Sequence, residues 1–362
     1  MYNIFIYMAT LIIAFSPDLS YAEEEKGLLS ILDFTKEKTS PEENKKEEQT
    51  SSEDAHQKMI QDADNGDVSE QLNLGYLFLY GNKDIPADAS KAFHYYSLAA
   101  AQNDNIAINN LGSLYYSGIG TTADVAKAME LFEKAHELGN VEAAVNLAFL
   151  YMTENPRSID SSKAMDLFMS AAKGNNPTAQ FMVGYAYRHG FIFPKDYGKA
   201  FEYLQKSALA QFDEAQYQTA LLYMEGLGVP QNYGKAVTYL NAAVGQGHLK
   251  AMVTLAQILS EGRKYPRNIY KAHILYNLAA VLGAPNASIN RDNLGYNMKI
   301  EDILRAQAEA DAFRAAPSEL TGYITQTFGK NITAYVDRYI VPEEPKQEPK
   351  APPENANKKG LL

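Results

Sequence analysis

The stretch NIAINNLGSLYYSGIGTTADVAKAMELFEKAHELGN, Asn105–Asn140, is one period of a repeat. Its Lys-Ala dipeptide recurs at intervals of 36 residues, and the lysines are Lys91, Lys127, Lys163, Lys199, Lys235 and Lys271. A fixed period of this size is typical of a solenoid, in which each unit buries its apolar face on its neighbours. The middle of the chain therefore divides into six units, 67–104, 105–140, 141–176, 177–212, 213–248 and 249–284.

Each unit is predicted to contain two antiparallel helices. In the first helix, Ala107, Gly112 and Tyr115 lie on one face at helical spacing, and Gly118 can end the helix in the left-handed conformation. The small residue lets the partner helix approach closely, and the ring fills the space beside it. In the third unit Glu154 replaces the glycine, which leaves the conformation of that loop open.

The second helix of each unit begins at a residue that can cap it, three positions before the lysine. These residues are Asp88, Asp124, Asp160, Asp196, Asn232 and Asn268. Bulky pairs such as Leu131-Phe132 and a closing small residue such as Ala135 follow. Small and large side chains thus alternate on both helices, as two interdigitating helices require.

This pattern resembles the Sel1-like repeat, a relative of the tetratricopeptide repeat. The matching residues in one unit are Ala107, Leu111, Gly112, Tyr115, Gly118, Gly120, Lys127, Ala128, Phe132, Ala135 and Gly139. The resemblance implies an all-α, right-handed α-solenoid of about six helix-turn-helix repeats, capped by helices at both ends. It also implies that the first helices line a concave face and that the protein gathers other proteins. Bacterial members include exported proteins that regulate signalling or take part in host contact.

The two ends of the chain differ from the repeat. Residues 1–22 resemble a secretory signal peptide, because the apolar run Ile4–Phe15 is too short to cross a bilayer and Ala22 ends a cleavage-site pattern. The segment before the run has no Lys or Arg, so a buried or interfacial N-terminal helix is the alternative. We expect an exported protein, periplasmic or secreted, without a membrane span after cleavage.

The other boundaries follow from composition. Residues 23–54 are predicted to be a disordered acidic linker, 55–284 the solenoid with a capping half-unit at 55–65, 285–340 the C-terminal capping helices and 341–362 a disordered tail. The formal net charge is −11 and there is no cysteine. A basic stripe for nucleic acid is missing from the sequence, and so are thiolate nucleophiles and thiolate metal ligands.

No catalytic or metal-binding motif stands out. The histidines, His56, His94, His136, His189, His248 and His273, form no zinc-protease pattern. The Gly-x-Gly pairs follow helices rather than strands, so the dinucleotide-binding context fails. We predict no catalytic residue, no metal and no cofactor, and a protein or peptide as the partner.

The predicted site is the concave face. In tetratricopeptide-like geometry, three positions of each first helix point into the groove: three residues before the small residue, and one and four after it. We call the predicted set the groove residues: Tyr76, Asn109, Tyr116, Phe149, Met152, Phe181, Tyr185, Arg188, Tyr217 and Met224. Such side chains are favoured at interface hot spots. Any one ring can instead pack between neighbouring units. The favoured part is the contiguous set Phe149, Phe181, Tyr185, Arg188 and Tyr217.

Three functions remain open at this stage. The first is a non-catalytic scaffold that binds a peptide or protein in the groove. The alternative is a periplasmic regulator or inhibitor of a sensor kinase or envelope enzyme, with the chain ends as its switch. The third is a hydrolase, for which a closed pocket with a perturbed carboxylate would be the supporting observation.

Overall fold

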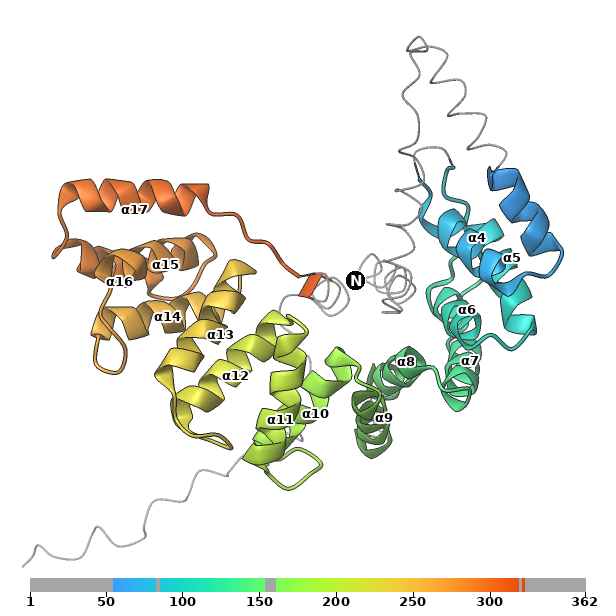
Figure 1. Cartoon of the computed structure of the whole chain (residues 1–362), viewed down its shortest axis with the longest axis horizontal. Helices are drawn as coiled ribbons and strands as arrows, with labels where there is room; N and C mark the ends of the chain where they lie inside the picture. The colour runs from blue at the N-terminus through green and yellow to red at the C-terminus, as the bar shows by residue number, and fades with distance from the viewer. Residues whose placement is uncertain (1–54, 83–84, 154–160, 319–320, 323–362) are drawn as a thin grey trace, which may run out of the picture.

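The computed structural model describes residues 55–82, 85–153, 161–318 and 321–322. Within these residues all regular structure is helical and no strand occurs, which confirms the predicted all-α solenoid (Figure 1). A helix over residues 55–64 comes first. The first helices of the six units are α4 (Val68–Tyr80), α6 (Asn105–Ser117), α8 (Val141–Thr153), α10 (Pro177–His189), α12 (Asp213–Glu225) and α14 (Leu249–Glu261). The second helices are α5 (Ala89–Ala101), α7 (Val125–Glu137), α9 (Ser161–Lys173), α11 (Tyr197–Leu209), α13 (Tyr233–Gly245) and α15 (Ile269–Val281).

The helix ends follow the predicted caps. In the second unit, the Asp124 side chain accepts a hydrogen bond from the Lys127 backbone N–H at 2.9 Å, and Gly118 ends α6 with a φ of 70°. Equivalent caps begin the other second helices within the described residues, at Asp88, Asp196, Asn232 and Asn268. The predicted cap Asp160 and the deviating Glu154 lie outside the described residues.

The two helices of a unit approach closely at the small residue. A Cβ atom added to Gly112 would lie 2.9 Å from the Phe132 ring, and one added to Gly184 would lie 2.8 Å from Leu204. Real Cβ atoms do not approach other atoms this closely, so the small residue sets the spacing between the helices. The repeat therefore preserves this position because of packing.

In four of the six units, the lysine of the Lys-Ala dipeptide covers the ring of the first helix. The Nζ atom lies 4.8 Å from the ring centre of Phe78 for Lys91, and 5.0 Å from that of Tyr187 for Lys199. Exposed cation–π contacts of this kind contribute about 0.5–1 kcal/mol each. In the second unit, Lys127 pairs with Glu130 at 2.9 Å. In the sixth unit Leu259 replaces the ring, and Lys271 bonds Asn241 instead, at 2.8 Å. The regularity of the lysines thus has a structural cause.

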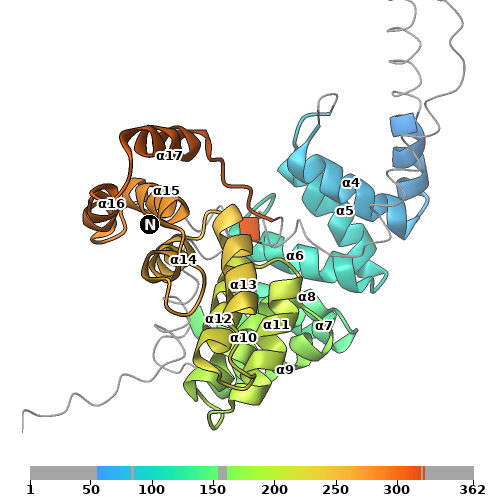
Figure 2. The same ribbon diagram turned by 60° about the vertical axis from the view of Figure 1, so that its left-hand side comes forward.

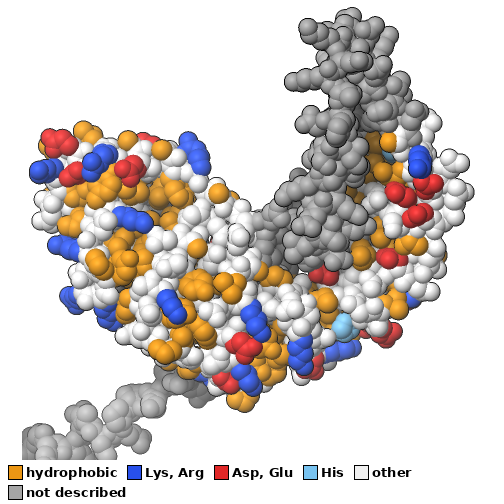
Figure 3. Space-filling model, in the orientation of Figure 1, with side chains coloured by type: hydrophobic (Ala, Val, Ile, Leu, Met, Phe, Trp, Pro, Cys, Tyr) orange, Lys and Arg blue, Asp and Glu red, His pale blue; other side chains and the backbone are white. Residues whose placement is uncertain are grey.

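The units are stacked into a curved arc (Figures 1 and 2). In Figure 1, α4, α6 and α8 border the hollow of the arc, whereas α5, α7 and α9 lie on its outer side. The space-filling view shows that the surface is hollowed beside the arm of α14–α17 (Figure 3). Each helix pair packs on the next, so the apolar core runs along the array rather than around one centre.

The C-terminal end of the array is closed by two further helices. The helical pattern predicted over 289–316 is broken at 296–299, because α16 (Ala287–Gly295) and α17 (Ile300–Ala312) are separate helices. Helix α17 lies against α15 and buries Ala306 and Ala310 on its inner side. Residues 313–318 then run back toward α12 (Figure 1). The predicted signal peptide, acidic linker and C-terminal tail lie outside the described residues.

Candidate binding surface

The groove residues divide into a buried half and an accessible half. Buried members are Asn109, Phe149, Met152, Phe181 and Tyr185. Accessible or half-buried members are Tyr76, Tyr116, Arg188, Tyr217 and Met224. All ten lie on first helices, but the structure does not bring them together as one accessible strip.

The buried aromatic rings pack inside the array, both between the two helices of a unit and at the start of the next unit. Phe181 of α10 is fully buried and meets Phe212, the residue before α12, edge-on, with ring centres 5.0 Å apart. Phe149 of α8 meets Phe168 of α9 in the same way, also at 5.0 Å. These side chains bury large apolar areas and stabilise the array. Their burial limits what they can offer to a partner in this conformation.

The accessible groove residues are spaced along the arc. Tyr76 on α4 is 51% exposed, and its ring lies 4.8 Å from that of Tyr80. Tyr217 and Met224 are half-buried on α12. Arg188 on α10 bonds Glu225 of the next unit at 3.2 Å, and its side chain is 11% exposed. The accessible surface thus presents tyrosines, a methionine and a paired arginine.

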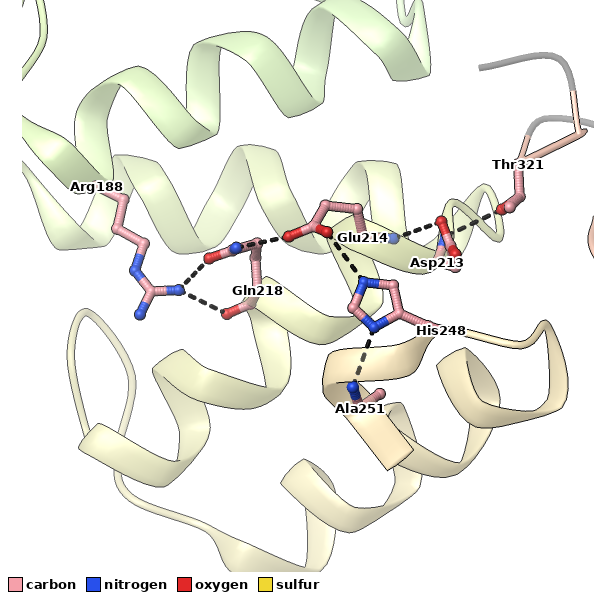
Figure 4. A network of polar contacts seen from close by, with 7 residues as sticks. All are labelled: Arg188, Asp213, Glu214, Gln218, His248, Ala251 and Thr321. Atoms are coloured by element: carbon pink, nitrogen blue, oxygen red, sulfur yellow. Dashed lines mark hydrogen bonds and ion pairs between the residues drawn. The ribbon is translucent and has the colours of Figure 1, made fainter. Parts of the chain in front are cut away.

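A buried polar network connects the fourth, fifth and sixth units (Figure 4). Arg188 donates to the side-chain oxygen of Gln218, and Gln218 donates to the carboxylate of Glu214 at 2.7 Å. The other carboxylate oxygen of Glu214 lies 2.9 Å from Nε2 of His248. Glu214 and His248 are 7% and 8% exposed at the side chain. Because a buried polar group costs free energy when unpaired, this network fixes the three units relative to one another.

The imidazole of His248 has a structural role. Its Nδ1 atom accepts a hydrogen bond from the Ala251 backbone N–H at 3.1 Å and so caps α14. That bond requires an unprotonated Nδ1, so Nε2 carries the proton and donates to Glu214. Both nitrogens and both carboxylate oxygens are therefore engaged within the fold. This arrangement supports a packing function for the pair rather than general acid–base chemistry.

A smaller polar contact recurs nearer the N-terminal end. Asn146 on α8 donates to the side-chain oxygen of Asn109 on α6 at 2.9 Å, and both are buried. Asn109 was predicted to face a partner, but here it joins the second and third units. The sequence carried a signal for such pairs, because polar residues recur in the middle of otherwise apolar first helices.

A pocket of about 830 Å³ lies at the C-terminal part of the array. Leu249 and Met252 of α14, Leu278 of α15 and Phe313 supply apolar walls, and Asp213 supplies a carboxylate. Burial raises the pKa of Asp213, while His248 and the Glu214 backbone N–H act in the opposite direction. This is the pocket with a perturbed carboxylate that the hydrolase hypothesis would need, but Glu214 and His248 beside it are committed to the network described above.

The raised pKa of Asp213 predicts a pH-dependent loss of stability. The folded state favours the neutral carboxyl of Asp213. The contribution of this group to the free energy of unfolding is therefore complete below its ordinary pKa of 3.8, and it is lost as the pH rises through the pKa of the folded state. Asp213→Asn should therefore be more stable than the parent at pH 7, and its unfolding midpoint should lie at a higher urea concentration. The difference should vanish below pH 3.8. Urea titrations from pH 3 to pH 8 would measure it, with the exposed Asp311→Asn as the control. A parent that is more stable than Asp213→Asn at pH 7 would contradict the assignment.

Two further properties bound the chemistry of the described part of the chain. There, no group of three or more His, Asp or Glu residues is arranged to hold a metal ion. None of the described helices is both long enough and apolar enough to cross a membrane.

The repeat is found again by comparison with known proteins. A family model described as the Sel1 repeat matches residues 71–104, 105–140, 141–176, 177–212, 213–248 and 249–283. A Sel1 repeat protein from Oxalobacter formigenes is similar in structure, with 26% sequence identity, a TM-score of 0.53, and coverage of 68% of this chain and 100% of its own. A protective antigen of uropathogenic Escherichia coli with an SLR fold is 19% identical, with a TM-score of 0.48 and coverage of 81% of this chain and 68% of its own. A search of curated proteins finds no match.

Proposed function

Because this chain belongs to the Sel1 repeat family, we propose that it is a non-catalytic scaffold that binds a protein or peptide segment on the hollow side of its arc. Sel1 repeat proteins generally mediate protein–protein interactions. The six matched units give this chain a long surface of the same kind. The proposal concerns which side of that surface is used and which residues make the contacts.

The observation that carries the proposal is the chemistry of the accessible groove residues. Tyr76, Tyr116, Arg188, Tyr217 and Met224 remain at least partly accessible on the first helices. Tyrosine, methionine and arginine are enriched at interface hot spots because they bury large areas and also offer polar atoms. Their spread over several units suits an extended segment better than a compact ligand.

We also propose that the protein acts outside the cytoplasm. The support is the N-terminal pattern of a short apolar run followed by a cleavage site after Ala22. Mass spectrometry of the protein purified from its native envelope would test this. A mature chain beginning at Glu23 is expected, and an intact N-terminus in a cytoplasmic fraction would overturn it.

Site-specific photo-crosslinking would test the binding surface. A benzophenone amino acid at Tyr76 or Tyr217 should crosslink to the same partner protein in cells, because both positions lie on first helices. The matched controls are His94 of α5 and Lys206 of α11, which are exposed on second helices. Equal crosslinking of that partner from the control positions would place the interface elsewhere.

A further inference from the structure

One first helix begins without the cap that the others have. Within the described units, the side chain that precedes each of the other five first helices accepts a hydrogen bond from a backbone N–H of that helix. These side chains are Asp67, Asp104, Asn140, Asn176 and His248. Helix α12 instead follows Phe212, which makes no such bond and is buried against Phe181. The backbone N–H groups at the start of α12 therefore need another acceptor.

The segment after α17 supplies that acceptor from 108 positions away in sequence. The Thr321 hydroxyl accepts a hydrogen bond from the Asp213 backbone N–H at 3.0 Å (Figure 4). Asp213 is the first residue of α12, so Thr321 supplies the acceptor for its N–H, while the Asp213 side chain accepts from the Glu214 N–H at 2.7 Å. Two more bonds hold the segment nearby: Ala316 N–H donates to the Gly245 carbonyl at 2.9 Å, and Ser318 N–H donates to the Gln246 side chain at 2.9 Å.

A second deviation from the repeat lies at the same place. Gln211 has a φ of 65°, a conformation that costs most side chains about 1 kcal/mol or more. Its described counterparts in the other units are glycine or asparagine: Gly66, Asn103, Gly139, Asn175 and Gly247. The Gln211 carbonyl accepts from the hydroxyl of Ser318 at 2.6 Å and from that of Thr321 at 3.2 Å. Residues 211–213 thus depart from the repeat where the C-terminal segment lands.

The same segment forms one wall of the 830 Å³ pocket. Phe313, Arg314, Ala315, Pro317 and Thr321 line it on that side. The opposite wall belongs to the solenoid. Ala315, Ala316 and Pro317 are exposed, so little apolar surface holds the middle of the segment down. A segment fixed by a few hydrogen bonds opens at a lower free energy than a packed helix.

We propose that residues 313–318, together with Thr321, are a latch, which opens and closes over the pocket while the solenoid stays folded. In the closed state, Thr321 accepts from the Asp213 N–H, and the hydroxyls of Ser318 and Thr321 donate to the Gln211 carbonyl. In the open state, the Asp213 N–H and the Gln211 carbonyl lose these partners and the pocket loses a wall. Opening of the pocket and loss of the hydrogen bond to the start of α12 therefore occur in the same conformational change. An interaction that stabilises the closed segment also stabilises the start of α12.

Hydrogen exchange on the full chain would test the latch, with Thr321→Val as the variant and Thr321→Ser as its matched control. Valine keeps the shape of threonine but cannot accept the bond, whereas serine keeps the hydroxyl. We expect the amides of Asp213, Ala316 and Ser318 to exchange about tenfold faster in Thr321→Val, with the amide of the buried Leu255 on α14 unchanged. Thr321→Ser should behave as the parent.

Two results would overturn the latch. One is that the three amides exchange at the same rate as Leu255 in the parent, because the segment would then open only with the array. The other is that Thr321→Val leaves the three amides unchanged. A second readout is the fluorescence of anilinonaphthalene sulfonate, which should rise in Thr321→Val and in Ser318→Ala but not in Thr321→Ser. Equal fluorescence in all four proteins would refute the coupling to the pocket.

Discussion

Addition of one methyl group at Gly228 is expected to destabilise the protein by about 3–5 kcal/mol. A Cβ atom there would lie 2.0 Å from the carbonyl oxygen of Tyr197 and 2.4 Å from its carbonyl carbon. Tyr197 begins α11, so the loop of the fifth unit rests directly on the backbone of the fourth. Backbone atoms cannot rotate away as a side chain can. Urea unfolding of Gly228→Ala, followed by circular dichroism, would measure the loss.

The matched control is Gly226→Ala, two residues earlier in the same loop. Both glycines have a φ of 70°, but the atoms nearest to a Cβ on Gly226 all belong to Gln231, with its Cβ at 3.3 Å and its backbone N at 3.5 Å. Its expected cost is the left-handed conformation alone, about 1–2 kcal/mol. Ile192, the counterpart of Gly228 in the loop of the fourth unit, has a φ of 61°, so a branched residue can adopt the left-handed conformation where the neighbouring unit leaves room. Equal losses for the two variants would show that backbone conformation, and not contact between units, fixes the loop.

The sequence predicted the parts of the fold that repeat. A small residue such as Gly112, a ring such as Tyr115 and a cap such as Asp124 each have one geometric task, and the same task occurs in every unit. Repetition makes such positions visible without a structure. The structure adds the cause for one of them, because in four of the six units the lysine of the Lys-Ala dipeptide lies over the ring of the first helix.

The groove residues could be predicted only in part. Helical spacing places Phe181 and Tyr217 at the same position of consecutive units, three residues before the small residue. Phe181 is fully buried and Tyr217 is half-buried. The difference arises because the residue before the next unit is Phe212 in one case and His248 in the other. Such contacts depend on how one unit is rotated against the next, which one helix alone does not reveal.

The polar network could not be predicted from the sequence, because its residues do not recur in every unit. His248 occurs once in the array and a glutamate at the position of Glu214 recurs only as Glu142, so periodicity gives the pair no weight. Phe212 and Gln211 also deviate from the repeat, and all four lie at the junction of the fifth unit with its neighbours. A departure from an otherwise regular repeat is therefore a usable signal. It indicates a position where another part of the chain supplies what the unit lacks.

Phe181→Ala is expected to destabilise the array by about 3–5 kcal/mol, because it removes a fully buried ring at the contact between the fourth and fifth units. The ring packs against Phe212 and Tyr185, so the space left behind is enclosed by other rings. In a linear array the loss falls on the interface between two units. Amides of α10 and α12 should therefore lose more protection from hydrogen exchange than amides of α4.

Tyr76→Ala separates packing from recognition. Tyr76 is a groove residue that is 51% exposed, so its removal should cost no more than about 0.5 kcal/mol of stability. If the hollow side binds the partner, Tyr76→Ala should weaken binding with the fold intact. Phe181→Ala should weaken it only in proportion to unfolding, and osmolytes that refold the variant should restore binding. If refolded Phe181→Ala still failed to bind, Phe181 would have to contact the partner directly. Because Phe181 is buried in the array, the fourth and fifth units would then have to separate when the partner binds.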